Sequence, residues 1–142
     1  MQDQNFKNHA RMVPGYHYIS FLLVVFLLIG AIVNLVKSSS ENLYSASLLV
    51  LIPIIFLLIS FYARLFALRA QDRAIKAEEN FRHYLLTGEP LNTELRMRQI
   101  IGLRFASDDE FPVLAEKAVA EKMSEKEIKQ SVVTWKPDYY RV

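Results

Sequence analysis

Cysteine is absent from this chain of 142 residues, and glycine is scarce, with four in all. The lack of cysteine excludes a disulfide, a thiolate metal site and a cysteine nucleophile. None of the four glycines stands in the spacing of a phosphate-binding loop. His9, His17 and His83 also lack the spacing of a metal site. The usual sequence signals of catalysis and cofactor binding are therefore missing.

Charge is absent from two long stretches, 12–36 and 42–63. Each is long enough for a helix to cross the hydrocarbon core of a bilayer, which is about 30 Å thick. The first stretch is too long for a secretory signal and lacks a cleavage pattern before the second. We predict an all-α membrane protein whose two spans, about 17–36 and 44–66, form a transmembrane hairpin.

Basic residues predict how the hairpin is oriented. Lys7 and Arg11 precede the first span, a group of basic residues follows the second, and the connecting loop holds only Lys37. Since basic residues are enriched on the cytoplasmic side, we expect both termini in the cytoplasm. Aromatic and basic residues near the cytoplasmic ends of the spans are expected to contact the lipid interface, namely Tyr16, Tyr18, Tyr62, Arg64 and Arg69.

Charged residues are concentrated after the second span, where 14 of the 17 basic and 13 of the 15 acidic residues lie from Arg64 onward. This near balance does not favour nucleic acid as a partner. Strong helix formers continue from the second span to Gly88-Glu89-Pro90, which predicts one long helix ending there. We therefore divide the chain into a tail (1–15), the hairpin (16–67), a helical extension (68–88) and a unit of short helices with an extended tail (89–142).

Three short helices are expected in this last unit. The first begins at Asn92 or Thr93 and ends at Gly102, the second covers about 109–123, and the third covers about 125–135. Two capping boxes support them, formed by Ser107 with Glu110 and by Ser124 with Glu127. The acidic run 108–110 is interpreted as part of a helix start, because adjacent carboxylates there do not converge on one ligand.

One face of the predicted long helix carries small residues at alternating steps of three and four. Its members are Ser60, Ala63, Ala67, Ala70, Ala74, Ala77, Phe81 and Tyr84. Small side chains at this spacing allow a second helix to approach closely. The partner is either another part of the same chain or a separate membrane protein, including a second copy.

The aromatic tail offers a second surface for a partner, through Trp135, Tyr139 and Tyr140. These side chains either pack on the helical unit, lie among lipid headgroups or anchor another protein. Within the spans the strongly polar side chain is Asn34, accompanied by hydroxyls such as Ser20 and Ser60. Because charged groups for an ion or proton path are absent there, transport by this chain alone is not expected.

Several segments together resemble an uncharacterised bacterial family of small two-span membrane proteins, labelled as a domain of unknown function. The resemblance covers nearly the whole chain and is carried by Asn5-Phe6-Lys7-Asn8-His9, Leu43-Tyr44-Ser45-Ala46-Ser47-Leu48, Gln71-Asp72-Arg73-Ala74, Ala77-Glu78-Glu79-Asn80 and Leu103-Arg104-Phe105-Ala106-Ser107-Asp108. It implies an architecture and a bacterial cytoplasmic membrane, and it transfers no catalytic residue.

The function expected from these observations is that of a non-enzymatic scaffold or accessory subunit. It would associate through helix–helix contacts with itself or with a larger membrane complex, without a cofactor, metal or evident small-molecule substrate. One alternative is a sensor of anionic lipid that uses Arg64, Arg69, Arg73, Arg96, Arg98 and Arg104. Another is a homo-oligomeric pore lined by Asn34, Ser20 and Ser60.

Overall fold

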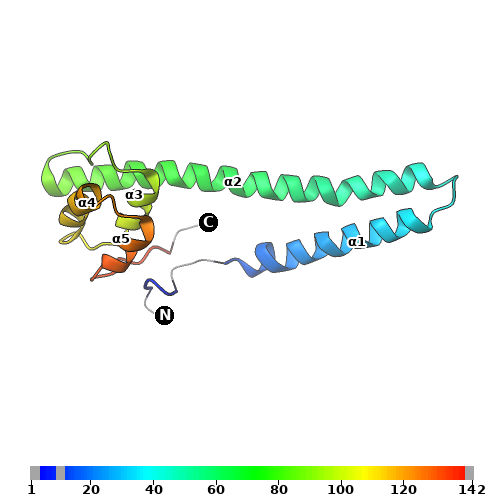
Figure 1. Cartoon of the computed structure of the whole chain (residues 1–142), viewed down its shortest axis with the longest axis horizontal. Coiled ribbons are helices and arrows are strands. Elements are labelled where there is room, and N and C mark those ends of the chain that lie inside the picture. Colours follow the sequence, from blue (N-terminus) through cyan, green and yellow to red (C-terminus); the bar gives the residue numbers. More distant parts are fainter. Residues whose placement is uncertain (1–3, 9–11, 140–142) are drawn as a thin grey trace. The chain divides into compact units, whose positions relative to one another are not determined.

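The computed structural model of the chain describes residues 4–8 and 12–139, and the secondary structure of these residues is helical (Figure 1). Its elements in order are the short π-helix η1 (Gly15–Ser20), α1 (Phe21–Lys37), α2 (Leu43–Thr87), α3 (Met97–Leu103), α4 (Phe111–Ala120) and α5 (Glu125–Ser131). Within the described ranges the extended pairing is limited to an isolated bridge between Ala106 and Trp135. The all-α prediction is confirmed.

The chain forms two compact units. One contains residues Arg11–Ala67, and the other contains Met1–Ala10 together with Leu68–Val142. We refer to them as the apolar unit and the charged unit. Helix α2 contributes its first part to the apolar unit and its last part to the charged unit.

The apolar unit consists of η1, α1 and the first part of α2, joined by a short loop after Lys37. Helix α1 ends where Ser38 becomes extended, and the Ser38 hydroxyl donates a hydrogen bond to the carbonyl of Asn34 (2.8 Å). The buried positions of this unit are small or compact side chains, Ala31, Ala46 and Pro53. Small side chains let two helices approach closely. At the other end of the pair, the Tyr16 hydroxyl donates to the carbonyl of Ser60 (2.6 Å).

The segments Gly15–Lys37 and Leu43–Thr87 are both long and apolar enough for a membrane crossing, judged by length and composition. Helix α2 continues without a break through Pro53 to Thr87. It ends as the sequence predicts, because Gly88 takes a positive φ of 80° that favours glycine. The Gly88 amide donates to the carbonyl of Tyr84 (2.8 Å), which completes the last turn.

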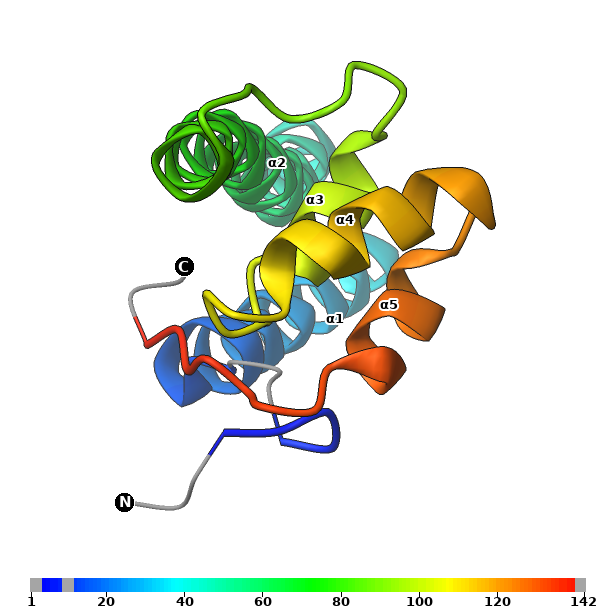
Figure 2. The same cartoon turned by 90° about the vertical axis from the view of Figure 1, so that its left-hand side faces the viewer.

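The charged unit has its own core, built where α3 packs on both α4 and α5 (Figure 2). Leu103, Phe105, Phe111 and Ile128 are among its completely buried side chains. A methyl group added at Gly102 would meet Ile128 Cγ2 at 3.1 Å, so glycine is what allows α3 to lie so close to α5.

A buried glutamine links the helices of this core. The side-chain amide of Gln99 donates to the carbonyls of Ala118 (3.2 Å) and Met123 (2.9 Å). Its oxygen accepts from the Arg96 amide (2.8 Å), which caps the start of α3. All three groups would be costly to bury without a partner, so this side chain fixes α3 against the end of α4.

The helix boundaries in this unit differ from those predicted. Helix α3 begins at Met97 and not at Asn92 or Thr93, because the Asn92 side chain accepts the Glu94 amide (2.9 Å) in a local turn and Arg96 is extended. Helix α4 is shorter than the predicted 109–123 and ends before the positive φ of Lys122 (51°).

Helix α5 is also shorter than predicted and ends at Ser131, where the following residue turns extended. The capping box of Ser124 and Glu127 at its start is confirmed by both reciprocal hydrogen bonds. Of the second predicted box, the bond from the Ser107 amide to Glu110 is present (3.1 Å), while Glu110 itself occupies the N-cap position of α4.

Gln4 and Asp138, which lie near the two ends of the described residues, meet within the charged unit. The Gln4 side chain donates to the carbonyl of Asp138 (3.2 Å) and accepts from the Asp138 amide (2.7 Å). These two residues are separated by 134 positions in the sequence. The segment that precedes the first apolar helix therefore lies beside the segment that follows α5.

Candidate functional site

The small-residue face of α2 is largely uncovered. We call it the alanine face, and it consists of the residues predicted from sequence, Ser60, Ala63, Ala67, Ala70, Ala74, Ala77, Phe81 and Tyr84. Ser60 and Ala67 are half-buried, and the other six are exposed. Phe81 and Tyr84 are 62% and 54% exposed. From Ala70 onward, no described part of the same chain covers this face, so the internal partner considered above is not found there.

The opposite side of α2 packs on the charged unit. Ile75 is 6% exposed and belongs to the core, and one turn later Glu79 is 9% exposed. Arg82 follows at the same side of the helix and is half-buried. At about 100° per residue, positions 75, 79 and 82 lie ~150° around the helix from the alanine face. One helix thus presents a covered side and an uncovered side.

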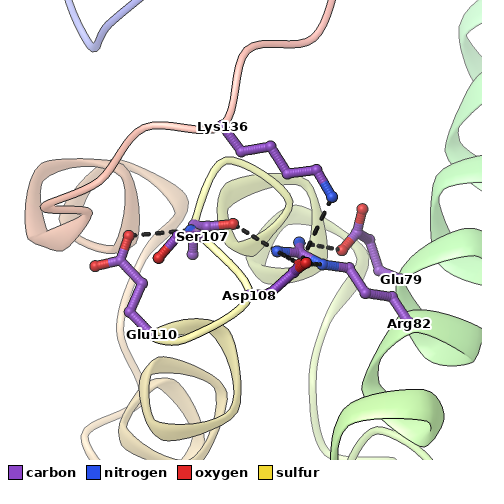
Figure 3. A network of polar contacts seen from close by, with 7 residues as sticks. Glu79, Arg82, Ser107, Asp108, Glu110 and Lys136 are labelled. Carbon is purple, nitrogen blue, oxygen red and sulfur yellow. Dashed lines mark hydrogen bonds and ion pairs between the residues drawn. The ribbon is translucent and has the colours of Figure 1, made fainter.

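Arg82 is the centre of the polar contacts on the covered side (Figure 3). Its Nε donates to Asp108 Oδ1 (2.7 Å), Nη1 donates to Glu79 Oε2 (3.0 Å) and Nη2 donates to the carbonyl of Ala106 (2.7 Å). The guanidinium also lies 4.4 Å from the centre of the Phe111 ring. A planar group with several fixed donors suits this arrangement better than an ammonium would. Arg82 therefore ties α2 to the segment before α4.

The acidic run 108–110 has two separate tasks. Asp108 pairs with Arg82 and lies 3.7 Å from Lys136 Nζ, and the hydrogen bond from Arg82 holds the pKa of the Asp108 carboxyl below its usual value of 3.8. Glu110 accepts the amides of Ser107, Val133 and Thr134, each at 3.1 Å. The interpretation of this run as part of a helix start is confirmed for Glu110, which occupies the N-cap position of α4, although no acidic residue lies in the first turn of that helix.

A groove of about 480 Å³ opens beside this network within the charged unit. Its apolar wall includes Phe81 and Leu85, and its charged wall includes Arg82, Asp108 and Lys136. The cations are matched by carboxylates, since Arg82 and Lys136 share Asp108 and Arg104 Nη1 lies 3.1 Å from Asp138 Oδ2. Four acidic and three basic side chains line the groove, so its charge is nearly balanced and most of it is used in these pairs. The groove is thus mainly a structural junction.

Trp135 in the aromatic tail packs on the charged unit. Its ring stacks on the buried ring of Phe105, with centroids 4.6 Å apart and an interplanar angle of 20°. Arg104 lies over the same Phe105 ring, at 4.7 Å. Of the three places considered for these aromatics, Trp135 takes the packed one. Tyr139 is 43% exposed, and Tyr140 lies outside the described residues.

Tyr16 and the other aromatic residues predicted at the lipid interface lie toward the end of the apolar unit that is opposite the loop after Lys37. Tyr16, Tyr18 and Tyr62 are 39%, 53% and 49% exposed. Tyr16 is held beside α2 by its bond to Ser60, which fixes these aromatics at similar positions along the two helices. Arg64 is half-buried and Arg69 is exposed.

Three residues of the two alternative functions, Arg104, Ser20 and Asn34, have defined surroundings in the structure. Arg104, one of six arginines considered for lipid sensing, is 8% exposed and paired with Asp138, so this residue is wrong as a lipid contact. Ser20 donates to the carbonyl of Gly15 (2.9 Å) within its own helical turn. Asn34 lies at the loop end of the unit, far along α1 from Ser20. In the single chain these polar groups do not line one path.

Among residues 4–8 and 12–139, no group of three or more His, Asp or Glu side chains converges where a metal ion could bind. His83 Nδ1 lies 2.8 Å from the carbonyl of Glu89, and its ring meets Phe111 edge to face at 5.8 Å. These contacts indicate that His83 has a structural role, because they hold the end of α2 against the following turn and against Phe111.

Sequence reasoning missed the roles of Arg82 and Gln99. Arg82 carries no recognisable sequence motif, yet it pairs with Glu79 and with Asp108, 26 positions away. Only the position of Arg82 on the same helical side as the apolar Ile75 could have signalled its burial.

Comparison with known proteins adds the family. A family model described as a family of unknown function (DUF6526) matches residues 1–142, which confirms the resemblance to an uncharacterised family. No curated protein and no solved structure matches the chain. The chain belongs to the family of unknown function DUF6526.

Proposed function

We propose that this chain is an integral membrane protein of the bacterial cytoplasmic membrane that serves as a non-enzymatic scaffold or accessory subunit. Its two apolar helices form a hairpin across the bilayer, and α2 carries the charged unit into the cytoplasm. The uncovered face of α2 associates with another helix, either of a second copy or of a larger membrane complex.

The observation that carries this proposal is the exposure of apolar side chains around both long helices. In the most apolar 18-residue stretches of the two helices, only 6% and 11% is buried. Leu23, Phe26 and Ile59 are each more than half exposed. Soluble monomers rarely leave contiguous apolar patches of this extent in water. A helix that is apolar on all sides is buried in a large core or in lipid, and this chain offers no such core.

Backbone and hydroxyl groups in the apolar unit fit a lipid environment. A helix of 23 residues, as in Gly15–Lys37, spans about 35 Å, enough for a hydrocarbon core of ~30 Å. Serine hydroxyls donate to carbonyls of their own helix, as Ser20 does to Gly15 and Ser47 does to Tyr44. Such internal bonds are what lipid requires, because it supplies no partner for polar groups.

The meeting of the two chain ends supports an even number of crossings. Gln4 precedes the first apolar helix and Asp138 follows the charged unit, yet the two are hydrogen-bonded. These bonds support a topology in which Gln4 and Asp138 lie on the same side of the membrane. Basic residues precede the first apolar helix and follow the second, whereas the loop between the helices contributes only Lys37. This distribution favours a cytoplasmic location for Gln4 and Asp138.

A scaffold role is supported by where the chain keeps its charges and its free surface. Apart from Glu78, the charged groups that line the groove pair with each other or with a neighbouring carboxylate, and these pairs hold the unit together. The alanine face from Ala70 to Tyr84 is the helix surface left for a partner. Close packing of small residues is a main source of helix association when lipid surrounds part of a helix.

Thiol labelling in this cysteine-free chain tests the topology. Ser39→Cys lies in the loop between the helices, and Lys126→Cys is its matched control on the charged unit; both positions are exposed. In intact cells, an impermeant thiol reagent should label Ser39→Cys, and it should label Lys126→Cys only after the cells are opened. Release of the wild-type chain from membranes by alkaline carbonate, or equal labelling of both variants, would refute the hairpin.

Association is tested by native purification in mild detergent with mass determination. A stoichiometric companion protein, or a multiple of the chain mass, is the expected result. A clean monomer at the concentrations of the cell membrane would remove the scaffold proposal while leaving the hairpin intact.

A further inference from the structure

The uncovered side of α2 in the charged unit contains more than small residues. Ala70, Ala74 and Ala77 are followed by the exposed rings of Phe81 and Tyr84. Leu85 beside them is 67% exposed. An apolar helix face that ends in exposed aromatic rings is typical of a surface that a partner covers.

The spacing of this face is a strict heptad repeat. Positions 60, 67, 74 and 81 stand at a, and positions 63, 70, 77 and 84 stand at d. An unbroken 3.5-residue repeat over this length predicts a left-handed coiled coil with another helix that has the same repeat. Helix α2 of a second copy is a helix of matching length and repeat.

Charges beside the face supply an independent observation. In this register Arg73 stands at g and Glu78 stands at e, and both are exposed. Within the described ranges neither side chain takes part in an ion pair. In a parallel coiled coil, a g residue lies beside the e residue five positions later on the partner helix. Arg73 of one copy would therefore lie beside Glu78 of the other, and the reverse pair would form by symmetry.

The remaining e and g positions of this segment are uncharged. They are Gln71 and Leu85 at e, and Asn80 and Thr87 at g. Arg73 and Glu78 are thus the two charged residues that flank the face in this segment. They have opposite signs and are five positions apart, which is the separation that pairs g with e in two parallel identical helices. An antiparallel pair would instead place g beside g and e beside e, which opposes like charges.

We propose that the alanine face of α2 binds the same face of a second copy of this chain, with the two helices parallel and Arg73 of each copy beside Glu78 of the other. This rests on the proposed function, because two copies inserted in one membrane with the same topology must run parallel. The covered side of α2, with Ile75, Glu79 and Arg82, stays packed on its own charged unit.

The size of the face indicates that the membrane contributes to the pairing. Two Phe81 and two Tyr84 rings, each already about half covered, would add on the order of 400 Å² of buried surface. A standard stable interface buries roughly 1,200–2,000 Å². Stable pairing therefore also needs the alanine contacts and the parallel alignment that a shared membrane supplies. For this reason the pairing should be tested with the full-length chain in membranes.

Cysteine crosslinking in membranes tests the contact. Ala74→Cys and Ala77→Cys, made one at a time, place a thiol at a and at d, where identical residues of two parallel helices face each other. Lys76→Cys is the control, because this exposed residue stands at c, away from the face. Under mild oxidation, disulfide-linked dimer is expected from the two alanine variants and only background from the control.

Charge reversal then tests the register. In the Ala74→Cys chain, Arg73→Glu or Glu78→Arg should lower the dimerisation constant about fivefold, because two exposed ion pairs become repulsive. The double reversal should restore the yield of crosslinked dimer given by the Ala74→Cys chain without charge changes. Both residues are exposed in the single chain, so neither change disturbs the fold.

The outcomes separate this proposal from the proposed function. Chain that resists carbonate extraction, but whose Ala74→Cys and Ala77→Cys variants crosslink no more than Lys76→Cys, overturns the pairing and leaves the membrane hairpin standing. Crosslinking to a different protein overturns it equally. Failure of the double reversal to rescue overturns the parallel register. A chain that carbonate releases removes both proposals together.

Discussion

Removal of the Arg82 guanidinium is the most informative single change for the charged unit. In Arg82→Met the apolar stem is kept, while the donors to Glu79, Asp108 and the carbonyl of Ala106 are lost. Glu79 is then left as a carboxylate whose side chain is only 12% exposed. Leaving one partner of a buried pair costs about 3–5 kcal/mol.

The expected loss lies near the lower end of this range. Asp108 is 60% exposed, so water replaces most of its contact, and an exposed pair contributes only about 0–1 kcal/mol. We therefore expect Arg82→Met to lower the free energy of unfolding by ~3 kcal/mol, which is a large share of a small unit's stability. Arg82→Lys should have a free energy of unfolding between those of the wild type and Arg82→Met, because an ammonium keeps the charge but cannot reproduce the planar set of hydrogen bonds.

Urea unfolding in mild detergent, followed by tryptophan fluorescence, measures this loss. Trp135 is the single tryptophan of the chain and stacks on Phe105 in the same unit, so its emission reports on that unit. Arg98→Met is the matched control, since Arg98 is 79% exposed and should change stability by less than about 0.5 kcal/mol.

A second variant distinguishes an uncompensated charge from simple loss of packing. Arg82→Met combined with Glu79→Leu removes both charges, and should recover most of the lost stability because a buried pair is often replaceable by apolar residues. The reasoning is refuted if Arg82→Met is as stable as Arg98→Met, or if the double variant is no more stable than the single one.

Three further changes probe the same unit by the same fluorescence measurement. Gly102→Ala should lower stability by about 1 kcal/mol, because crowding against Ile128 outweighs the gain in helix propensity, and a stability equal to that of the wild type would contradict this. Glu110→Gln should cost roughly 1–2 kcal/mol, since one carboxylate accepts three backbone amides, and an unchanged midpoint would contradict this. The lowered pKa of Asp108 stabilises the fold above its unfolded value of 3.8, and this contribution disappears as the pH falls through the lower folded pKa. Asp108→Asn should therefore show a weaker loss of stability below about pH 4 than the wild type, and an identical acid profile would refute the pairing.

The sequence predicted those features that depend on local patterns. Two charge-free stretches predicted the two apolar helices, and Gly88 predicted the end of α2, because glycine readily takes the positive φ found there. The capping box of Ser124 and Glu127 was likewise visible, since both partners lie within one helical turn.

Features that depend on distant contacts were not predictable in this way. Glu110 occupies the helix start that the sequence predicted for it, but two of its backbone partners, Val133 and Thr134, come 23 and 24 residues later. These bonds help to keep the chain extended after α5, which is why the predicted helix to Trp135 stops at Ser131. Helix propensity carries no information about such a competing partner.

The pair formed by Gln4 and Asp138 also sets an order of events during folding. Its two residues are 134 positions apart, so one is synthesised near the start of the chain and the other near the end. Contacts of such sequence separation close late, because the intervening chain must first be arranged. The pair therefore forms only after both apolar helices have been made. Its formation would therefore report that the two segments of the charged unit, before the first apolar helix and after α5, have come together.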